Sequence, residues 1–90
     1  MVVFSGRVRR WREDQRGGLA VVDVLAELVP ALGGRRQMRV VGTLNGVAFT
    51  GSTMLVAGGG LCIGVSAASL RAAAVCVGDD VDMELRRAQG

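Results

Sequence analysis

The fold is decided by the stretch Arg39-Val40-Val41-Gly42-Thr43-Leu44-Asn45-Gly46-Val47-Ala48-Phe49 at the centre of the chain. Asn-Gly between two runs of strand-forming residues is the preferred loop of a tight β-hairpin, because both central positions need a positive φ. We therefore predict two antiparallel strands joined by Asn45 and Gly46, and we expect the second strand to continue to Val56.

The N-terminal part of the chain predicts two more strands. Residues 2–10 alternate from Phe4 onward, so that Phe4 and Val8 fall on one face, as in a half-buried strand. Residues 19–24 are a continuous apolar run, which indicates a strand that is buried on both faces. The polar segment between the two strands ends in a glycine pair and is typical of a loop.

The C-terminal part closes the fold with a strand of its own. Gly78 and Asp79 are typical of a turn, in which the Asp79 carboxylate accepts hydrogen bonds from turn amides. In the strand that follows, over residues 80–85, acidic and apolar residues alternate. We expect the tail, residues 85–90, to be frayed.

Two short helical segments complete the predicted secondary structure. Leucine and valine recur at helical intervals over residues 25–32, but Pro30 predicts a short turn of helix or two broken pieces. Between the two segments, we predict a further short strand over residues 61–65. Ser66 then suits the N-cap of a helix over residues 67–74, since its hydroxyl can accept a backbone N–H of the first turn.

Length and composition indicate one mainly β domain over residues 1–90. Half of the 90 residues are hydrophobic, but only Phe4, Trp11 and Phe49 are aromatic, so the core is built from small branched side chains. A core of this size is marginal for a lone chain, and sharing apolar surface with a second copy is a common remedy. We therefore expect a homodimer.

The charge is distributed unevenly along the sequence. The net charge is +3 and all eleven basic residues are arginine, of which five fall within residues 7–16, whereas four acids fall within residues 79–84. One interpretation is that the two ends are neighbouring strands whose charges face each other. The other is a polyanion-binding face. The candidate nucleic-acid contacts are Arg7, Arg9, Arg10, Arg12, Arg35 and Arg36.

The residue types argue against catalysis and metal binding. The chain has no histidine and no lysine, so its serines lack the usual activating base, and Cys62 and Cys76 lack both a partner of metal-site spacing and a group to lower their pKa. We expect two buried, reduced thiols in a cytoplasmic protein without a cofactor. Asp79 and Asp80 are adjacent in the chain and should point to opposite faces, so we do not expect the two carboxylates to share a catalytic site. Asp80 should be solvated or meet Arg71.

Several stretches together resemble a known family. The hairpin Gly42-Thr43-Leu44-Asn45-Gly46-Val47-Ala48-Phe49 and the turn Val77-Gly78-Asp79-Asp80-Val81 are similar to a bacterial and archaeal family of small domains of unknown function, found alone or fused to bacteriocin-protection-like domains. The resemblance extends from Phe4 to Leu85. It implies a double-split, or pseudo, β-barrel of about six to seven strands with one or two short helices, a fold analogous to that of AbrB-, MazE- and MraZ-like proteins.

Three functions remain open from the sequence. The first is a non-enzymatic binding or interaction module that forms a homodimer and does not bind membranes. The second is a DNA-binding regulator or antitoxin of the AbrB or MazE type, which would use the arginine-rich first strand. The third is a small-molecule site in the mouth of the barrel. Fold analogy alone does not choose among them, because one fold serves many functions.

Overall fold

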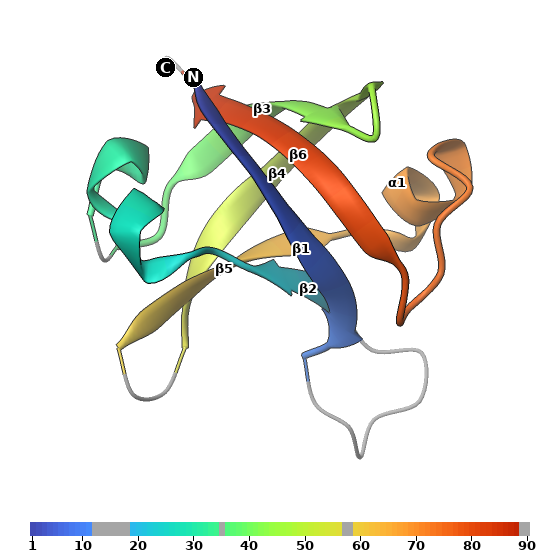
Figure 1. The fold of residues 1–90 in the computed structure, drawn as a ribbon, viewed down its shortest axis with the longest axis horizontal. Helices are drawn as coiled ribbons and strands as arrows, with labels where there is room; N and C mark the ends of the chain where they lie inside the picture. The colour runs from blue at the N-terminus through green and yellow to red at the C-terminus, as the bar shows by residue number, and fades with distance from the viewer. Residues whose placement is uncertain (12–18, 35, 57–58, 89–90) are drawn as a thin grey trace.

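The computed structural model describes residues 1–11, 19–34, 36–56 and 59–88 (Figure 1). Within these residues the chain forms six strands, one α-helix and two 3-10 turns. In chain order they are β1 (Val2–Arg10), β2 (Ala20–Asp23), η1 (Ala26–Leu28), η2 (Pro30–Leu32), β3 (Arg39–Leu44), β4 (Val47–Val56), β5 (Gly60–Val65), α1 (Ala67–Ala72) and β6 (Asp80–Arg87).

The strands close into a barrel in the order β1-β2-β5-β4-β3-β6, and every pair is antiparallel. Figure 1 shows α1 on one side of this barrel and the two 3-10 turns on the other. The prediction of a mainly β chain folded as a small barrel with a short helix is confirmed.

Two long strands each change partner along their length. β1 pairs with β6 through residues 2–7 and with β2 through residues 8–10. β4 pairs with β3 through residues 47–52 and with β5 through residues 53–56. We call the part that contains β6 and β3 the β6 half, and the part that contains β2 and β5 the β5 half.

Glycines lie where β1 and β4 change partner. A Cβ at Gly6 would lie 2.7 Å from the Val22 side chain, and one at Gly51 would lie 2.8 Å from the Gly64 carbonyl oxygen. Neither site has room for a larger residue without a shift of its neighbours. The missing side chains therefore let each long strand pass close to its neighbours at the junction of the two halves.

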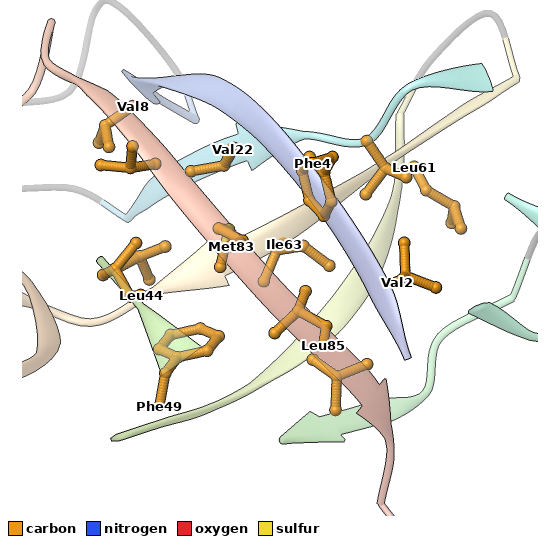
Figure 2. Packing of buried hydrophobic residues seen from close by; sticks show 14 of the residues in the cluster. Val2, Phe4, Val8, Val22, Leu44, Phe49, Leu61, Ile63, Met83 and Leu85 are labelled. Atoms are coloured by element: carbon orange, nitrogen blue, oxygen red, sulfur yellow. The ribbon is translucent and has the colours of Figure 1, made fainter. Parts of the chain in front are cut away.

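The interior of the barrel is filled by apolar side chains from every strand. In β6 the burial alternates strictly, with Val81, Met83 and Leu85 inside and the acids outside. Figure 2 shows Phe4 of β1 and Ile63 of β5 packed with them in the same cluster. The interior is a packed core in which valine and leucine predominate, as the composition predicts.

The turns follow the local chemistry of the sequence. Asn45 and Gly46 both have positive φ, of 49° and 80°, and join β3 to β4. The Asn45 side chain also accepts a 2.8 Å hydrogen bond from the Asp82 amide, which ties the hairpin to β6. Gly78 has a φ of 99°, and the Asp79 carboxylate accepts a 2.9 Å bond from the Cys76 amide.

Both helical segments are short, and α1 ends two residues before the predicted end at Ala74, which has a positive φ of 56°. The Ser66 hydroxyl accepts a 3.1 Å bond from the Ser69 amide and caps α1, which ends at Ala72. Two pieces, η1 and η2, replace a continuous helix around Pro30, which occupies the first position of the second piece. Proline is tolerated there because that position needs no amide donor.

The C-terminal tail is shorter than expected. β6 continues to Arg87, where Arg86 is paired with Val41 and Arg87 with Val40 of β3. The Ala88 amide also donates to the Arg39 carbonyl at 2.9 Å. The expectation of a frayed segment from residue 85 was wrong, because β3 supplies a partner that the sequence of the tail does not reveal.

Candidate anion-binding surface

Arg7 lies opposite an acid on the neighbouring strand. Its Cα partner on β6 is Asp80, and its Nε donates to the Asp80 carboxylate at 3.1 Å. Both side chains are about three-quarters exposed, at 70% and 74%, so the pair contributes well under about 1 kcal/mol. Asp80 is thus solvated, as expected, but its cationic neighbour is Arg7 and not Arg71.

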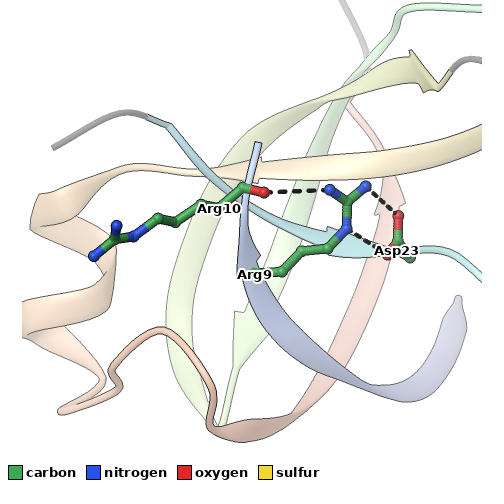
Figure 3. Close-up of polar contacts among 3 residues, drawn as sticks. All are labelled: Arg9, Arg10 and Asp23. Carbon is green, nitrogen blue, oxygen red and sulfur yellow. Dashed lines mark hydrogen bonds and ion pairs between the residues drawn. The ribbon is translucent and has the colours of Figure 1, made fainter. Parts of the chain in front are cut away.

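Arg9 makes the more extensive ion pair. Its Nε and one terminal nitrogen donate to the two oxygens of Asp23 on β2, at 2.7 and 2.9 Å, and its other terminal nitrogen donates to the Arg10 carbonyl at 3.2 Å (Figure 3). These bonds hold the pKa of Asp23 below its ordinary value, although partial burial opposes the effect. Arg7 and Arg9 of the first strand therefore each have an acidic neighbour that offsets their charge.

The remaining sequence candidates are dispersed. Arg10 is exposed and points away from Asp23 (Figure 3). Arg36 is exposed just before β3, beside the end of β6, whereas Arg7 lies beside the start of β6. Arg12 and Arg35 lie outside the described residues. The structure thus does not bring Arg36 together with Arg7 and Arg9 into one site.

A different group of arginines gathers where β3 begins and β6 ends. Two adjoining hollows share Met38 and Ala88 in their walls; Arg36 and Arg39 border the first, and Arg86 and Arg87 border the second. Of the described residues that line either hollow, none is acidic. We call the four residues Arg36, Arg39, Arg86 and Arg87 the arginine surface.

The register of the sheet explains why these arginines converge. Arg86 is paired with Val41, two residues after Arg39 on β3, and side chains of the same parity point to the same face. Arg39 and Arg86 are therefore diagonal neighbours on the outer face of the β6 half, about 7 to 8 Å apart at the backbone. Among the described residues, no carboxylate forms an ion pair with any arginine of the arginine surface.

One buried hydroxyl fixes the segment that carries Arg36. Thr53 of β4 is fully buried; its hydroxyl donates to the Arg36 carbonyl at 2.9 Å and accepts from the Met38 amide at 2.8 Å. The Thr53 amide donates to the Met38 carbonyl at 2.8 Å. Residues 36–38 are therefore held against the barrel, and the Arg36 side chain starts from a fixed backbone.

Comparison with known families identifies the family of this chain. The family model described as Domain of unknown function (DUF1905) matches residues 4–85, which is nearly the whole chain. The chain belongs to this family. No curated protein matches the sequence. Membership thus agrees with the resemblance noted above, and it brings no activity with it.

Sequence reasoning missed three arginines of this DUF1905 chain. Arg39 was taken as part of the hairpin, and Arg86 and Arg87 as part of a frayed tail. The signal that would have found them is the alternation of β6 itself, which continues past Leu85 and places Arg86 on the same outer face as Glu84. Pairing that strand with the hairpin would have brought Arg86 to Arg39.

The thiols do not form a reactive centre. Both cysteines are free; Cys62 is buried in β5 and Cys76 is exposed, so the expectation of two buried thiols was wrong for Cys76. Burial, followed by the negative charge of Asp23, raises the pKa of Cys62 to about 11. Cys62 therefore stays protonated at neutral pH and is a poor nucleophile.

The described part of the chain contains neither a metal-binding cluster nor a membrane-spanning helix. No group of three or more potential metal ligands occurs there. No helix there is long and apolar enough to cross a bilayer.

Proposed function

We propose that this domain is a non-enzymatic binding module that recognises phosphate- or carboxylate-bearing partners through its arginine surface. The observation that carries the proposal is the difference in charge balance between the two groups of arginines. Arg7 and Arg9 have acidic partners on adjacent strands, whereas the four guanidinium groups of the arginine surface surround hollows without an acidic wall.

The chemistry of guanidinium suits such partners. Each group can donate two parallel hydrogen bonds to a phosphate or carboxylate, and several groups on one rigid face can hold several anionic oxygens at once. The first hollow adds the Thr50 hydroxyl and the Gln37 side chain to Arg36 and Arg39. Because the side chains are exposed, binding should weaken steeply as the salt concentration rises, since salt screens the arginines and its cations compete with them for the anionic partner.

The two other functions have less support. A DNA-binding regulator that uses the first strand would have to break the ion pairs of Arg7 and Arg9, or bind with charges that Asp80 and Asp23 already offset. A ligand inside the barrel would displace the close-packed core that Phe4, Ile63 and Met83 help to fill. The arginine surface needs neither change.

Two matched triple variants test the proposal. Arg36→Gln/Arg39→Gln/Arg86→Gln and Arg7→Gln/Arg9→Gln/Arg10→Gln each remove three positive charges. We expect the wild type to be retained on heparin and on immobilised duplex DNA at low salt. The first variant should elute at a clearly lower salt concentration, and the second close to the wild type.

The outcomes separate the candidate functions. If the first-strand variant loses retention while the arginine-surface variant keeps it, the DNA-binding alternative is supported and the proposal is wrong. Absence of wild-type retention at about 20 mM salt would contradict both. Titration with inorganic phosphate is followed by the NMR shifts of the Arg39 and Arg86 amides. Shifts that saturate indicate a site for an isolated phosphate, whereas their absence, together with retention on heparin, indicates a site that needs a polymer.

A further inference from the structure

An acidic row lies on the same outer face as Arg39 and Arg86 of the arginine surface. Asp80, Asp82 and Glu84 alternate with buried residues along β6 and are all exposed, and Arg86 is next in the row. Asp80 is paired with Arg7, and Asp82 accepts a 2.6 Å bond from the Ser5 hydroxyl. For the Glu84 side chain, no hydrogen bond or ion pair occurs with the rest of the described chain.

The sheet register arranges this face in rows across the strands. Glu84 lies between Val3 of β1 and Thr43 of β3, and Arg86 lies beside Val41 in the next row. Val3 is 62% exposed, which is unusual for a valine, and Val41 is half-buried. At the centre of the face, Glu84 and Arg86 are thus flanked by the small side chains of Val3, Thr43 and Val41, with negative charge toward the start of β6 and positive charge toward its end.

We propose that a second copy of this chain docks on this face, with its acidic row against the arginine surface of the first. The two copies are related by a two-fold axis in the plane between their sheets. The axis runs perpendicular to β6 and passes between the rows of Glu84 and Arg86. This operation places each Glu84 against the other copy's Arg86. The same operation brings the Asp82 row over the row that contains Arg39. Such an interface is isologous, so each charged contact occurs twice.

The size of the face sets the strength of the contact. The face spans four strands over about six residues, which is roughly 20 Å by 20 Å, so two copies bury on the order of 800 Å² in total. Permanent dimers bury more, about 1,200 to 2,000 Å² or above. The dimer is therefore weak, and it depends on salt because its charges lie at an exposed surface.

Self-association and anion binding then use the same arginines. The acidic row of a second copy occupies the positions that an external phosphate or carboxylate would take. An anionic ligand at sufficient concentration displaces the second copy, and dilution frees the surface for ligand. This last step rests on the proposed function, whereas the dimer itself does not.

Charge exchange at two positions tests the dimer. We propose sedimentation equilibrium of the full chain at low salt for the wild type, Glu84→Arg, Arg86→Glu and the double variant Glu84→Arg/Arg86→Glu. Each single variant sets like charges against each other twice and should weaken self-association about tenfold. The double variant recreates opposite charges across the axis and should recover wild-type association within about a factor of three.

Two variants with the same charge changes elsewhere serve as controls. Glu27→Arg in η1 and Arg71→Glu in α1 change exposed residues that lie off this face, and both should associate as the wild type does. A wild type that stays monomeric at millimolar concentration, or a double variant that associates no better than the single variants, overturns the inference. Far-UV circular dichroism of each variant shows that the fold is retained.

One variant separates the dimer from the proposed function. Glu84→Arg keeps all four arginines of the arginine surface, so it should lose self-association and still be retained on heparin. If Glu84→Arg associates normally while the arginine-surface variant loses retention, the docking inference fails and the proposed function stands. If Glu84→Arg dissociates but no form binds heparin or phosphate, the proposed function fails and the dimer stands.

Discussion

The two groups of arginines in this chain differ in their neighbours rather than in their number. On β1, Arg7 faces Asp80 on β6, and Arg9 forms an ion pair with Asp23 on β2, which lies diagonally across from it, two residues beyond its register partner Val21. At the other end of β6, Arg39 and Arg86 face Ser52 and Val41 across their strand pairs. The first group is dense in the sequence and balanced in space, whereas the second is scattered in the sequence and unbalanced.

This difference shows what a charge cluster in a β protein means. Along a strand, successive side chains alternate between faces, so neighbours in sequence seldom act together. The cross-strand partner, which can be more than seventy residues away, decides whether a guanidinium is balanced. A basic segment of sequence is therefore a weak guide to a binding surface until the strand order is known.

The largest expected effect breaks the scaffold of the arginine surface. Gly42 lets β3 approach β6 so closely that a Cβ at this position would overlap the Glu84 carbonyl group. Gly42→Ala should force the two strands apart and cost about 3 kcal/mol of unfolding free energy, measured by urea denaturation. Gly60→Ala is the control, since among the described residues its Cβ would meet Val56 at an ordinary 3.8 Å and nothing closer. Equal stability of the two variants would contradict this account of β3 and β6.

A smaller change loosens one arginine and leaves the other group intact. Thr53→Val removes the hydroxyl that holds Arg36 and leaves the Met38 amide without its side-chain acceptor, which should cost about 1 to 3 kcal/mol. We also expect a moderate loss of heparin retention. Thr43→Val, on the outer face of the same hairpin, should leave the unfolding free energy within about 0.5 kcal/mol of the wild type. A stable Thr53→Val chain would show that residues 36–38 are held by other contacts.

The smallest expected effect concerns the balanced group and depends on pH. The pKa of Asp23 is lowered in the folded chain, so ionised Asp23 stabilises the fold above about pH 4, and that contribution disappears as the pH falls through the folded value. Since its side chain is 55% exposed, solvent limits the effect to a few tenths of a kcal/mol, or about 0.5 kcal/mol at most. Asp23→Asn should therefore flatten the stability profile below about pH 4, measured by urea denaturation across that range.

Local features of the fold were predictable from the sequence because each has a local cause. Asn45 and Gly46 supply the positive φ of the hairpin, Ser66 supplies the cap of α1, and Pro30 divides the helical segment. The alternation of β6 also predicts its buried face correctly. These signals lie within a few residues of the structures they determine.

The pairing between distant strands was less accessible, and the site depends on it. Nothing near Arg86 in the sequence reveals that Val41 is its partner, so the strand was expected to end too soon. The interpretation in which the charges of the first and last strands face each other agrees with the register, but Asp80 was expected to be solvated or to meet Arg71, and its partner is Arg7. Cys76 was expected to be buried from its apolar neighbours in sequence, but it lies in an exposed turn.

Closure of the strand order into a ring has a consequence for how the chain opens. Each strand has two hydrogen-bonded partner strands, so no strand can detach as a whole by breaking the bonds to one partner alone. Amide hydrogens in the middle of β3, β5 and β6 should thus exchange with solvent only when the whole barrel opens, with closely similar protection. The ring would behave as one cooperative unit, while the arginine side chains on its outside reorient without disturbing it.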